Sequence, residues 1–368
     1  GFRAMDKNTT GTSNVGIGMD SLRTSTTGCE NVAVGCGAMC STTTGNRSVA
    51  VGNNALFANT TGVNNTAVGW CALETNTEGV GNVGIGYEAL EANTTAGNGT
   101  AVGYRALCSN TTGADNVSVG ACNMKLNTTG HSNTAVGTCA LYTNTEGDTN
   151  TAVGHHALKL NTTAADNTGV GRNALCTTTT GCVNTALGSS AMQVNSTGDS
   201  NVAIGGSTLF NNTTADNNVA VGANAMVANT TGGNNVAMGY QSLLAQTTGD
   251  SNIAVGERAG CGLTTGNGNI IIGQGASQAT MTGACNIVLG YQGFLDATSA
   301  SCNIAIGYRA MFEHVDAAMN VAIGTCALGN NTSIGNQTAV GTCALRANTS
   351  GHSNTAFGYF AACANTTG

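Results

Sequence analysis

The chain has 368 residues, of which 54 are glycine and none is proline, and its formal net charge is −7. Only 11 residues are Lys or Arg and they form no basic run, which excludes the positive surface that nucleic-acid binding needs. No apolar run approaches the ~18 residues of a membrane span, and 41% hydrophobic with only 8% charged residues indicates an ordered chain held by backbone hydrogen bonds and small side chains.

A 17-residue repeat runs through the whole sequence. A glycine recurs at every seventeenth position from Gly1 to Gly358, with no insertion or deletion. The consensus unit is N-(T/V)-A-V-G-x-x-A-L-x-x-N-T-T-G-x-x, and we number its positions one to seventeen from Asn14. Such strict spacing is typical of a solenoid, in which each coil must register with the next. We therefore predict an all-β protein, a β-solenoid of about 21 stacked coils, as one continuous array over residues 1–368 that is a segment of a longer polypeptide.

Each unit begins with a strand pattern at positions one to five. Position two is β-branched from Val15 to Thr355, and position four is apolar from Ile17 to Phe357. This alternation predicts a short strand whose positions two and four face inward. The Ala-Leu or Ala-Met pair at positions eight and nine predicts a corner and a second short strand, with position nine inward. Asn-Thr-Thr-Gly at positions twelve to fifteen then predicts a turn.

Position three is almost always alanine or glycine, and the strand pattern turns it outward. A flat face of small residues suits close contact with another subunit, although a small-residue face left in water is the alternative. We predict self-association into a homo-oligomer or filament, such as a trimer or a bundle. The subunit-contact face would include Ala33, Ala50, Ala67, Ala135 and Ala152.

The N-(T/V)-A-V-G-x-x-A-L pattern, which covers the whole chain, resembles the head repeats of trimeric autotransporter adhesins and the glycine-rich β-roll repeats of phage tail fibres. The adhesin repeats are shorter and lack Asn-Thr-Thr-Gly. The resemblance implies an extracellular, cell-surface or virion-surface fibre that positions a binding tip.

Several of the 15 cysteines share a position in adjacent coils. Neighbouring coils would place such Cα atoms about 4.8 Å apart, within the range of a disulfide. Disulfides between coils would indicate an oxidising compartment, whereas free thiols would act as small apolar side chains. The candidate pairs are Cys122 with Cys139, Cys326 with Cys343, and Cys285 with Cys302.

Position twelve carries Asn-x-Ser/Thr in many coils. These asparagines are N-glycosylation acceptors if the protein is secreted by a eukaryote, although glycans on adjacent coils would crowd one another. The alternative is an asparagine ladder, in which each side-chain amide bonds to the amide one coil away. The candidates are Asn8, Asn59, Asn93, Asn110, Asn127, Asn161, Asn195, Asn212, Asn229, Asn331, Asn348 and Asn365.

Aromatic residues gather at position six, which holds six of the seven tyrosines. One interpretation is a structural ladder in which the rings of successive coils shield a corner. The functional alternative is a strip that binds sugars or another subunit. The tyrosines of this column are Tyr87, Tyr104, Tyr240, Tyr291, Tyr308 and Tyr359, and the predicted ladder consists of Trp70, Tyr87, Tyr104, Tyr291 and Tyr308.

Nothing in the sequence indicates catalysis. The five histidines are scattered over different repeat positions, and neither G-x-S-x-G nor H-E-x-x-H occurs. The acidic residues near the turn do not form paired calcium ligands. We predict no enzyme activity, no metal and no cofactor.

The repeat degenerates between Glu257 and Met319, where Ile271 and Val288 replace the small residue of position three. One explanation is local drift that the fold tolerates. We expect instead that this stretch meets a different neighbour, as a contact between subunits.

Three functions fit the repeat. The first is a structural fibre or filament, a rigid rod that self-associates outside a cell or on a virion. The second is an adhesin or tail-fibre shaft whose surface binds sugars or a receptor. The third is an ice-binding solenoid, which ranks last because the mixture of Val and Thr at position two is irregular.

Overall fold

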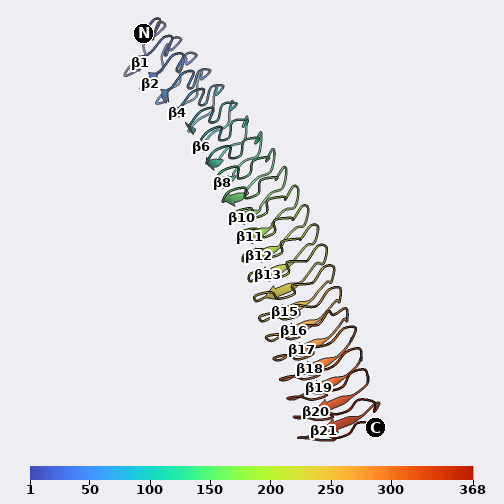
Figure 1. The fold of residues 1–368 in the computed structure, drawn as a ribbon. Coiled ribbons are helices and arrows are strands. Elements are labelled where there is room, and N and C mark those ends of the chain that lie inside the picture. The colour runs from blue at the N-terminus through green and yellow to red at the C-terminus, as the bar shows by residue number, and fades with distance from the viewer. Residues whose placement is uncertain (368) are drawn as a thin grey trace. The chain divides into compact units, whose positions relative to one another are not determined.

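The computed structural model describes residues 1–367. The chain forms two compact units, Gly1–Val183 and Asn184–Gly368. In each unit the backbone winds through successive coils that stack one above the next (Figure 1). No helix occurs among the described residues, so both units are built from short strands and turns.

Each strand has three residues, at positions two to four of the repeat. The strands of the first unit are β1 (Val15–Ile17), β2 (Val32–Val34), β3 (Val49–Val51), β4 (Thr66–Val68), β5 (Val83–Ile85), β6 (Thr100–Val102), β7 (Val117–Val119), β8 (Thr134–Val136), β9 (Thr151–Val153) and β10 (Thr168–Val170). Those of the second unit are β11 (Thr185–Leu187), β12 (Val202–Ile204), β13 (Val219–Val221), β14 (Val236–Met238), β15 (Ile253–Val255), β16 (Ile270–Ile272), β17 (Ile287–Leu289), β18 (Ile304–Ile306), β19 (Val321–Ile323), β20 (Thr338–Val340) and β21 (Thr355–Phe357).

Neighbouring strands within each unit are parallel and in register. Thr66 of β4 pairs with Val83 of β5 in the first unit, and Val202 of β12 pairs with Val219 of β13 in the second. Every such pair is one repeat apart, so each coil forms its hydrogen bonds with the coil directly above or below. The predicted all-β solenoid with a 17-residue coil is therefore confirmed.

The predicted orientation of the strand is wrong: position three faces the core, and positions two and four face outward. A Cβ placed on Gly84, at position three of β5, would lie 3.2 Å from both Leu73 Cγ and Ala89 O. Where the preceding coil carries leucine at position nine, too little room is left for a β-branched side chain, so the smallest residue of the strand turns inward. The face predicted to contact a subunit is thus an interior column, which holds the fully buried Ala33, Ala50, Ala67, Ala135 and Ala152.

Positions eight and nine form a turn instead of the predicted second strand. Leu56 and Leu90 at position nine have φ angles of 52° and 54°, a left-handed conformation that leucine rarely adopts. Both side chains are fully buried, as predicted. The Leu56 N–H donates to the Ala72 carbonyl of the next coil at 2.9 Å. Main-chain hydrogen bonds between coils therefore continue outside the strands.

The coils around β15–β17 fill the core differently. Position nine is Gly260 instead of leucine, and a Cβ placed there would lie 3.1 Å from Cδ1 of the fully buried Ile271. A Cβ placed on Gly293 would likewise lie 3.2 Å from Cγ1 of the buried Val288. A larger residue at position three thus occupies space that a smaller residue at position eight or nine leaves. Both side chains lie inside the coil and cannot touch a second subunit, and a subunit contact elsewhere in the stretch between Glu257 and Met319 stays a prediction.

Candidate functional site

The outer side of the strands is uncharged in both units, with an apolar side chain at position four and Val, Ile or Thr at position two. We call the side chains at positions two and four of β1–β21 the apolar sheet face. Val119 is 38% exposed and Ile272 is 40% exposed, and no strand carries a charged residue at either position. Because the strands are in register, these side chains form two straight columns in each unit. A continuous exposed apolar strip of this kind is typical of a contact surface.

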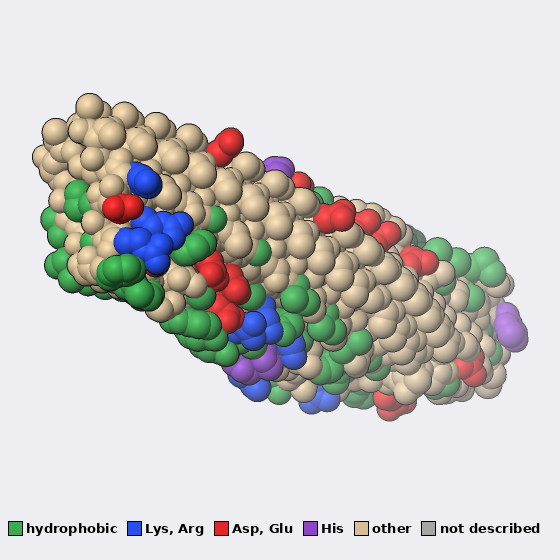
Figure 2. All heavy atoms as spheres, turned by 90° about the horizontal axis from the view of Figure 1, so that it is seen from above, with side chains coloured by type: hydrophobic (Ala, Val, Ile, Leu, Met, Phe, Trp, Pro, Cys, Tyr) green, Lys and Arg blue, Asp and Glu red, His purple; other side chains and the backbone are tan. Residues whose placement is uncertain are grey.

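Charged side chains lie elsewhere, in small separate groups on the face that Figure 2 presents. In one ion pair Arg105 Nε lies 2.6 Å from Glu88 Oε2. In another pair His131 Nε2 lies 3.1 Å from Asp148 Oδ2, a contact that is ionic only when the imidazole is protonated. These pairs join adjacent coils at turns, and they leave the apolar sheet face uncharged.

The aromatic column stacks in the structure. The ring centroids of Trp70 and Tyr87 are 5.0 Å apart at an interplanar angle of 20°, and those of Tyr87 and Tyr104 are 5.4 Å apart at 15°. The Tyr87 ring is covered on both faces, so it offers no free face on which a sugar could stack. This geometry favours the structural ladder over the sugar-binding strip at Tyr87. A hydrogen bond with Glu88 also raises the pKa of Tyr87 to about 12.

Position twelve forms the predicted asparagine ladder. Asn144 Nδ2 donates to Asn127 Oδ1 at 2.7 Å and to Gly147 O at 2.9 Å. Asn161 Nδ2 in turn donates to Asn144 Oδ1 at 2.7 Å. Each of these amides therefore forms one bond within its own turn and one with the neighbouring coil. These bonds take the place of the water that a buried amide cannot reach.

The prediction of N-glycosylation is wrong for the buried asparagines of this column. The amide nitrogen that would carry the glycan lies in the core, so a sugar could not be attached without opening the coil. The buried candidates are Asn59, Asn93, Asn110, Asn127, Asn161, Asn195, Asn212, Asn229, Asn331 and Asn348. Asn8 and Asn365 are only partly buried, and glycosylation of these two residues stays a prediction.

Sequence reasoning misses a second asparagine ladder, at position one. Asn133 Oδ1 accepts the Asn150 main-chain N–H at 2.9 Å, and Asn133 Nδ2 donates to Gly147 O at 2.8 Å. Both asparagines are fully buried. The signal was the near-constant asparagine at the start of each unit, since a β-strand has no intrinsic preference for asparagine at that place.

The predicted disulfides are absent, and all 15 cysteines are free thiols. In-register coils hold equivalent Cα–Cβ bonds parallel, so the Cβ atoms of paired cysteines stay about as far apart as the coils, near 4.8 Å. A disulfide needs Cβ atoms about 3.5–4.5 Å apart. The correction applies to Cys122 with Cys139, Cys326 with Cys343, and Cys285 with Cys302.

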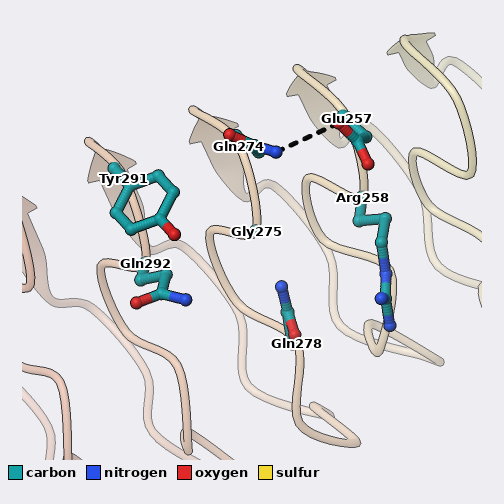
Figure 3. Close-up of a pocket in the computed structure, with 7 residues that line it drawn as sticks. All are labelled: Glu257, Arg258, Gln274, Gly275, Gln278, Tyr291 and Gln292. Carbon is teal, nitrogen blue, oxygen red and sulfur yellow. Dashed lines mark hydrogen bonds between the residues drawn. The ribbon is translucent and has the colours of Figure 1, made fainter.

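A recess of about 290 Å³ opens in the irregular part of the second unit. It lies where position seven is Gly275, between coils that carry Arg258 and Gln292 at the same position (Figure 3). We call this recess the polar notch. The residues that line it are Glu257, Arg258, Gln274, Gly275, Gln278, Tyr291 and Gln292.

A buried histidine interrupts the position-twelve ladder of the second unit. His314 stacks on Phe294 with ring centroids 5.2 Å apart. Its ring nitrogens lie 2.9 Å from Ala317 O and 3.1 Å from Asn331 O. Burial lowers the pKa of His314, although the two carbonyls act in the opposite direction.

Among residues 1–367 no group of three or more His, Cys, Asp or Glu side chains could hold a metal ion. The same residues include no helix long and apolar enough to cross a membrane. No protein-family model matches the chain, and no curated protein is significantly similar to it.

Proposed function

We propose that this protein is a structural β-solenoid of an extracellular fibre or filament, on a cell or a virion, and that it self-associates through the apolar sheet face. The observation that supports the proposal is the uncharged and mostly β-branched exterior of the strands in both units. The resemblance of the repeat to adhesin heads and phage tail fibres, both fibrous surface proteins, points the same way.

A second copy of this chain is the partner that the apolar sheet face fits best. The face repeats once per coil, at the roughly 4.8 Å spacing of hydrogen-bonded strands. Another copy carries the same spacing, so a contact made by one coil is repeated by the next. The face also carries no charge that would repel an identical face of a second copy. Two sheets can pack face to face through interdigitated apolar side chains.

Paired lysine substitutions test this proposal. V119K/V136K places two charges on the apolar sheet face of adjacent coils, where both valines are 38% exposed. T112K/T129K is the matched control, because both threonines are exposed at position fourteen of adjacent coils. Sedimentation velocity and electron microscopy of wild type are expected to show oligomers or filaments. V119K/V136K should be monomeric, and T112K/T129K should assemble as wild type does.

A wild-type protein that stays monomeric at high concentration would refute self-association. So would V119K/V136K assembling as wild type does, since the copies would then meet through another surface. Circular dichroism of both variants shows whether the coils still form.

Ice binding is a second candidate function, favoured by one observation. Position two faces outward on a regular sheet. The Val and Thr side chains that occur there have nearly the same shape, so the surface they form is even. A thermal-hysteresis measurement on wild type tests it. Hysteresis that is lost in V119K/V136K and kept in T112K/T129K would assign ice to this face, and no hysteresis in wild type would exclude ice.

A further inference from the structure

We propose that the polar notch binds a single pyranose unit of a saccharide. The site is independent of the apolar sheet face, because it lies at positions six to ten of the irregular coils. A pyranose ring offers an apolar C–H face for an aromatic ring and hydroxyl groups that both donate and accept hydrogen bonds. Such a ligand needs an open aromatic face beside side chains of mixed hydrogen-bonding character.

Tyr291 supplies the aromatic face. Its ring stacks on Tyr308 of the next coil, with centroids 5.6 Å apart and an interplanar angle of 9°. The opposite face of Tyr291 is turned toward the coil of Gln274, which has no ring at position six. Gln274 Nε2 donates to Glu257 Oε2 at 3.0 Å, so its amide is held away from Tyr291 (Figure 3). Tyr291 is therefore backed on one side and open on the side of the notch.

Gly275 shapes the notch beside this ring. Its φ of 63° is close to that of Asn54 (53°) and Asn224 (56°), which hold position seven in other coils. The backbone therefore does not require glycine here. A Cβ on Gly275 would collide with Gln278 Nε2, which shows that the Gln278 amide folds back over the glycine. The missing side chain gives room to the Gln278 amide, which an asparagine at this position would push into the notch.

The remaining side chains provide donors and acceptors. Gln292 Oε1 accepts from Arg309 Nε at 3.1 Å and Nη2 at 2.9 Å, which fixes the amide and leaves its NH₂ to donate. The Arg258 guanidinium and the Gln278 amide carry no ion pair or side-chain hydrogen bond within residues 1–367.

Glu257 sets the charge of the notch. It balances Arg258, so the site is close to neutral and disfavours an anion. A neutral polyhydroxylated ring is the class of ligand that matches both the open Tyr291 face and this mixed set of donors and acceptors. At about 290 Å³ the notch is small by the standard of ligand pockets, which fits one sugar ring and not a longer segment.

Saturation-transfer NMR and titration calorimetry test this inference on the full chain. The probes are methyl α-glucoside, methyl α-mannoside, methyl β-galactoside, methyl β-N-acetylglucosaminide and methyl α-fucoside. We expect at least one of them to bind wild type with a dissociation constant of about 1 mM. Tyr291→Ala and Gly275→Asn should each weaken that binding by about tenfold or more, because one removes the stacking face and the other fills the notch.

Two control variants separate the notch from the rest of the surface. Ser207→Asn makes a similar change at position seven of a regular coil, and Tyr104→Ala removes a ring of the other ladder. Both should bind the glycoside as wild type does. The inference is overturned if none of the five glycosides binds wild type, or if binding survives both Gly275→Asn and Tyr291→Ala. Thermal melts of all four variants exclude loss of fold as the cause of weaker binding.

Discussion

The regular coils around β4–β9 and the irregular coils around β15–β19 keep the same strand pairing with different interiors. In the regular coils, alanine at position three packs against leucine or methionine at position nine, and asparagine at position twelve bonds to its neighbours above and below. In the irregular coils, Ile271 packs in the space of Gly260, and His314 stands where asparagine is usual. The strand register is unchanged throughout.

This difference separates what the coil requires from what the repeat merely prefers. The coil requires a filled interior of constant volume, whichever position supplies it. Most buried polar groups also need a partner, which an asparagine ladder or a histidine between two carbonyls can each supply. The irregular coils are also where the polar notch opens, since the outward residues there depart from the repeat as well.

The largest effect is expected from breaking the continuous ladder. Asn144→Ala should lower the free energy of unfolding by about 4 kcal/mol, because it leaves Asn127 Oδ1 and one Asn161 N–H without a partner in the core and removes one of the two donors to Gly147 O. Asn331→Ala should lower it by only about 2 kcal/mol. Asn331 bonds within its own turn to Ile334, and its neighbour in the column is His314 instead of asparagine. Urea unfolding followed by circular dichroism measures both.

Equal losses in the two variants would contradict a cooperative ladder, since each asparagine would then act only within its own turn. Thr163→Ala, at the exposed position fourteen of the regular coils, is the control and should change the free energy of unfolding by less than about 0.5 kcal/mol.

Interior compensation in the irregular coils gives the next effect. Ile271→Ala should lower the free energy of unfolding by about 3 kcal/mol through the cavity it leaves. Ile272→Ala in the same strand points outward and should cost about 1 kcal/mol or less. Adding Gly260→Leu to Ile271→Ala restores the regular interior, and the double variant should recover most of the loss. The same urea unfolding measures these variants.

Failure of Gly260→Leu to rescue Ile271→Ala would show that the two positions do not share one space. A comparable loss in Ile272→Ala would show that burial at position three is not what stabilises the irregular coils.

A smaller, pH-dependent effect is expected at His314. Its pKa in the folded chain is lowered by burial below the roughly 6.5 of an unfolded chain. Between those two values the unfolded chain binds a proton that the folded chain does not. The free energy of unfolding should therefore fall as the pH drops below about 6.5, and the fall should stop near the folded-state pKa. His314→Asn should remove this component.

Urea unfolding at about pH 7.5 and about pH 5.5 measures the component as the difference between wild type and His314→Asn. His352→Asn, at an exposed site, is the control and should leave the pH dependence unchanged. If the pH dependence is the same in wild type and His314→Asn, the imidazole of His314 has the same charge in the folded and the unfolded chain, and the prediction is wrong.

The smallest effect is expected from reduction. All 15 cysteines are free, so a reductant should leave the melting temperature unchanged. Alkylation of the denatured protein without reductant should modify every thiol, as read from the intact mass. A mass short by two alkyl groups, with a melting temperature that falls on reduction, would reveal a disulfide after all.

Much of the site followed from column positions alone. The rings of Trp70, Tyr87 and Tyr104 stack because residues one period apart are neighbours in any in-register solenoid. The polar notch did not follow, since it depends on Gln278 folding over Gly275 and on Gln274 turning toward Glu257. Those are choices of side-chain conformation, and the repeat pattern carries no information on them.

The sequence by itself determined the period and the parallel, in-register stacking, because a coil can hydrogen-bond to its neighbour only if equivalent residues recur at one fixed interval. It also indicated the inward leucine of position nine. Only the tertiary structure decided which side of the strand is inside. An alternating Val-Ala-Val strand permits either orientation, and the choice depends on the width of the coil. With the position-nine leucine opposite, only the small side chain fits between the two walls, so the valines face outward.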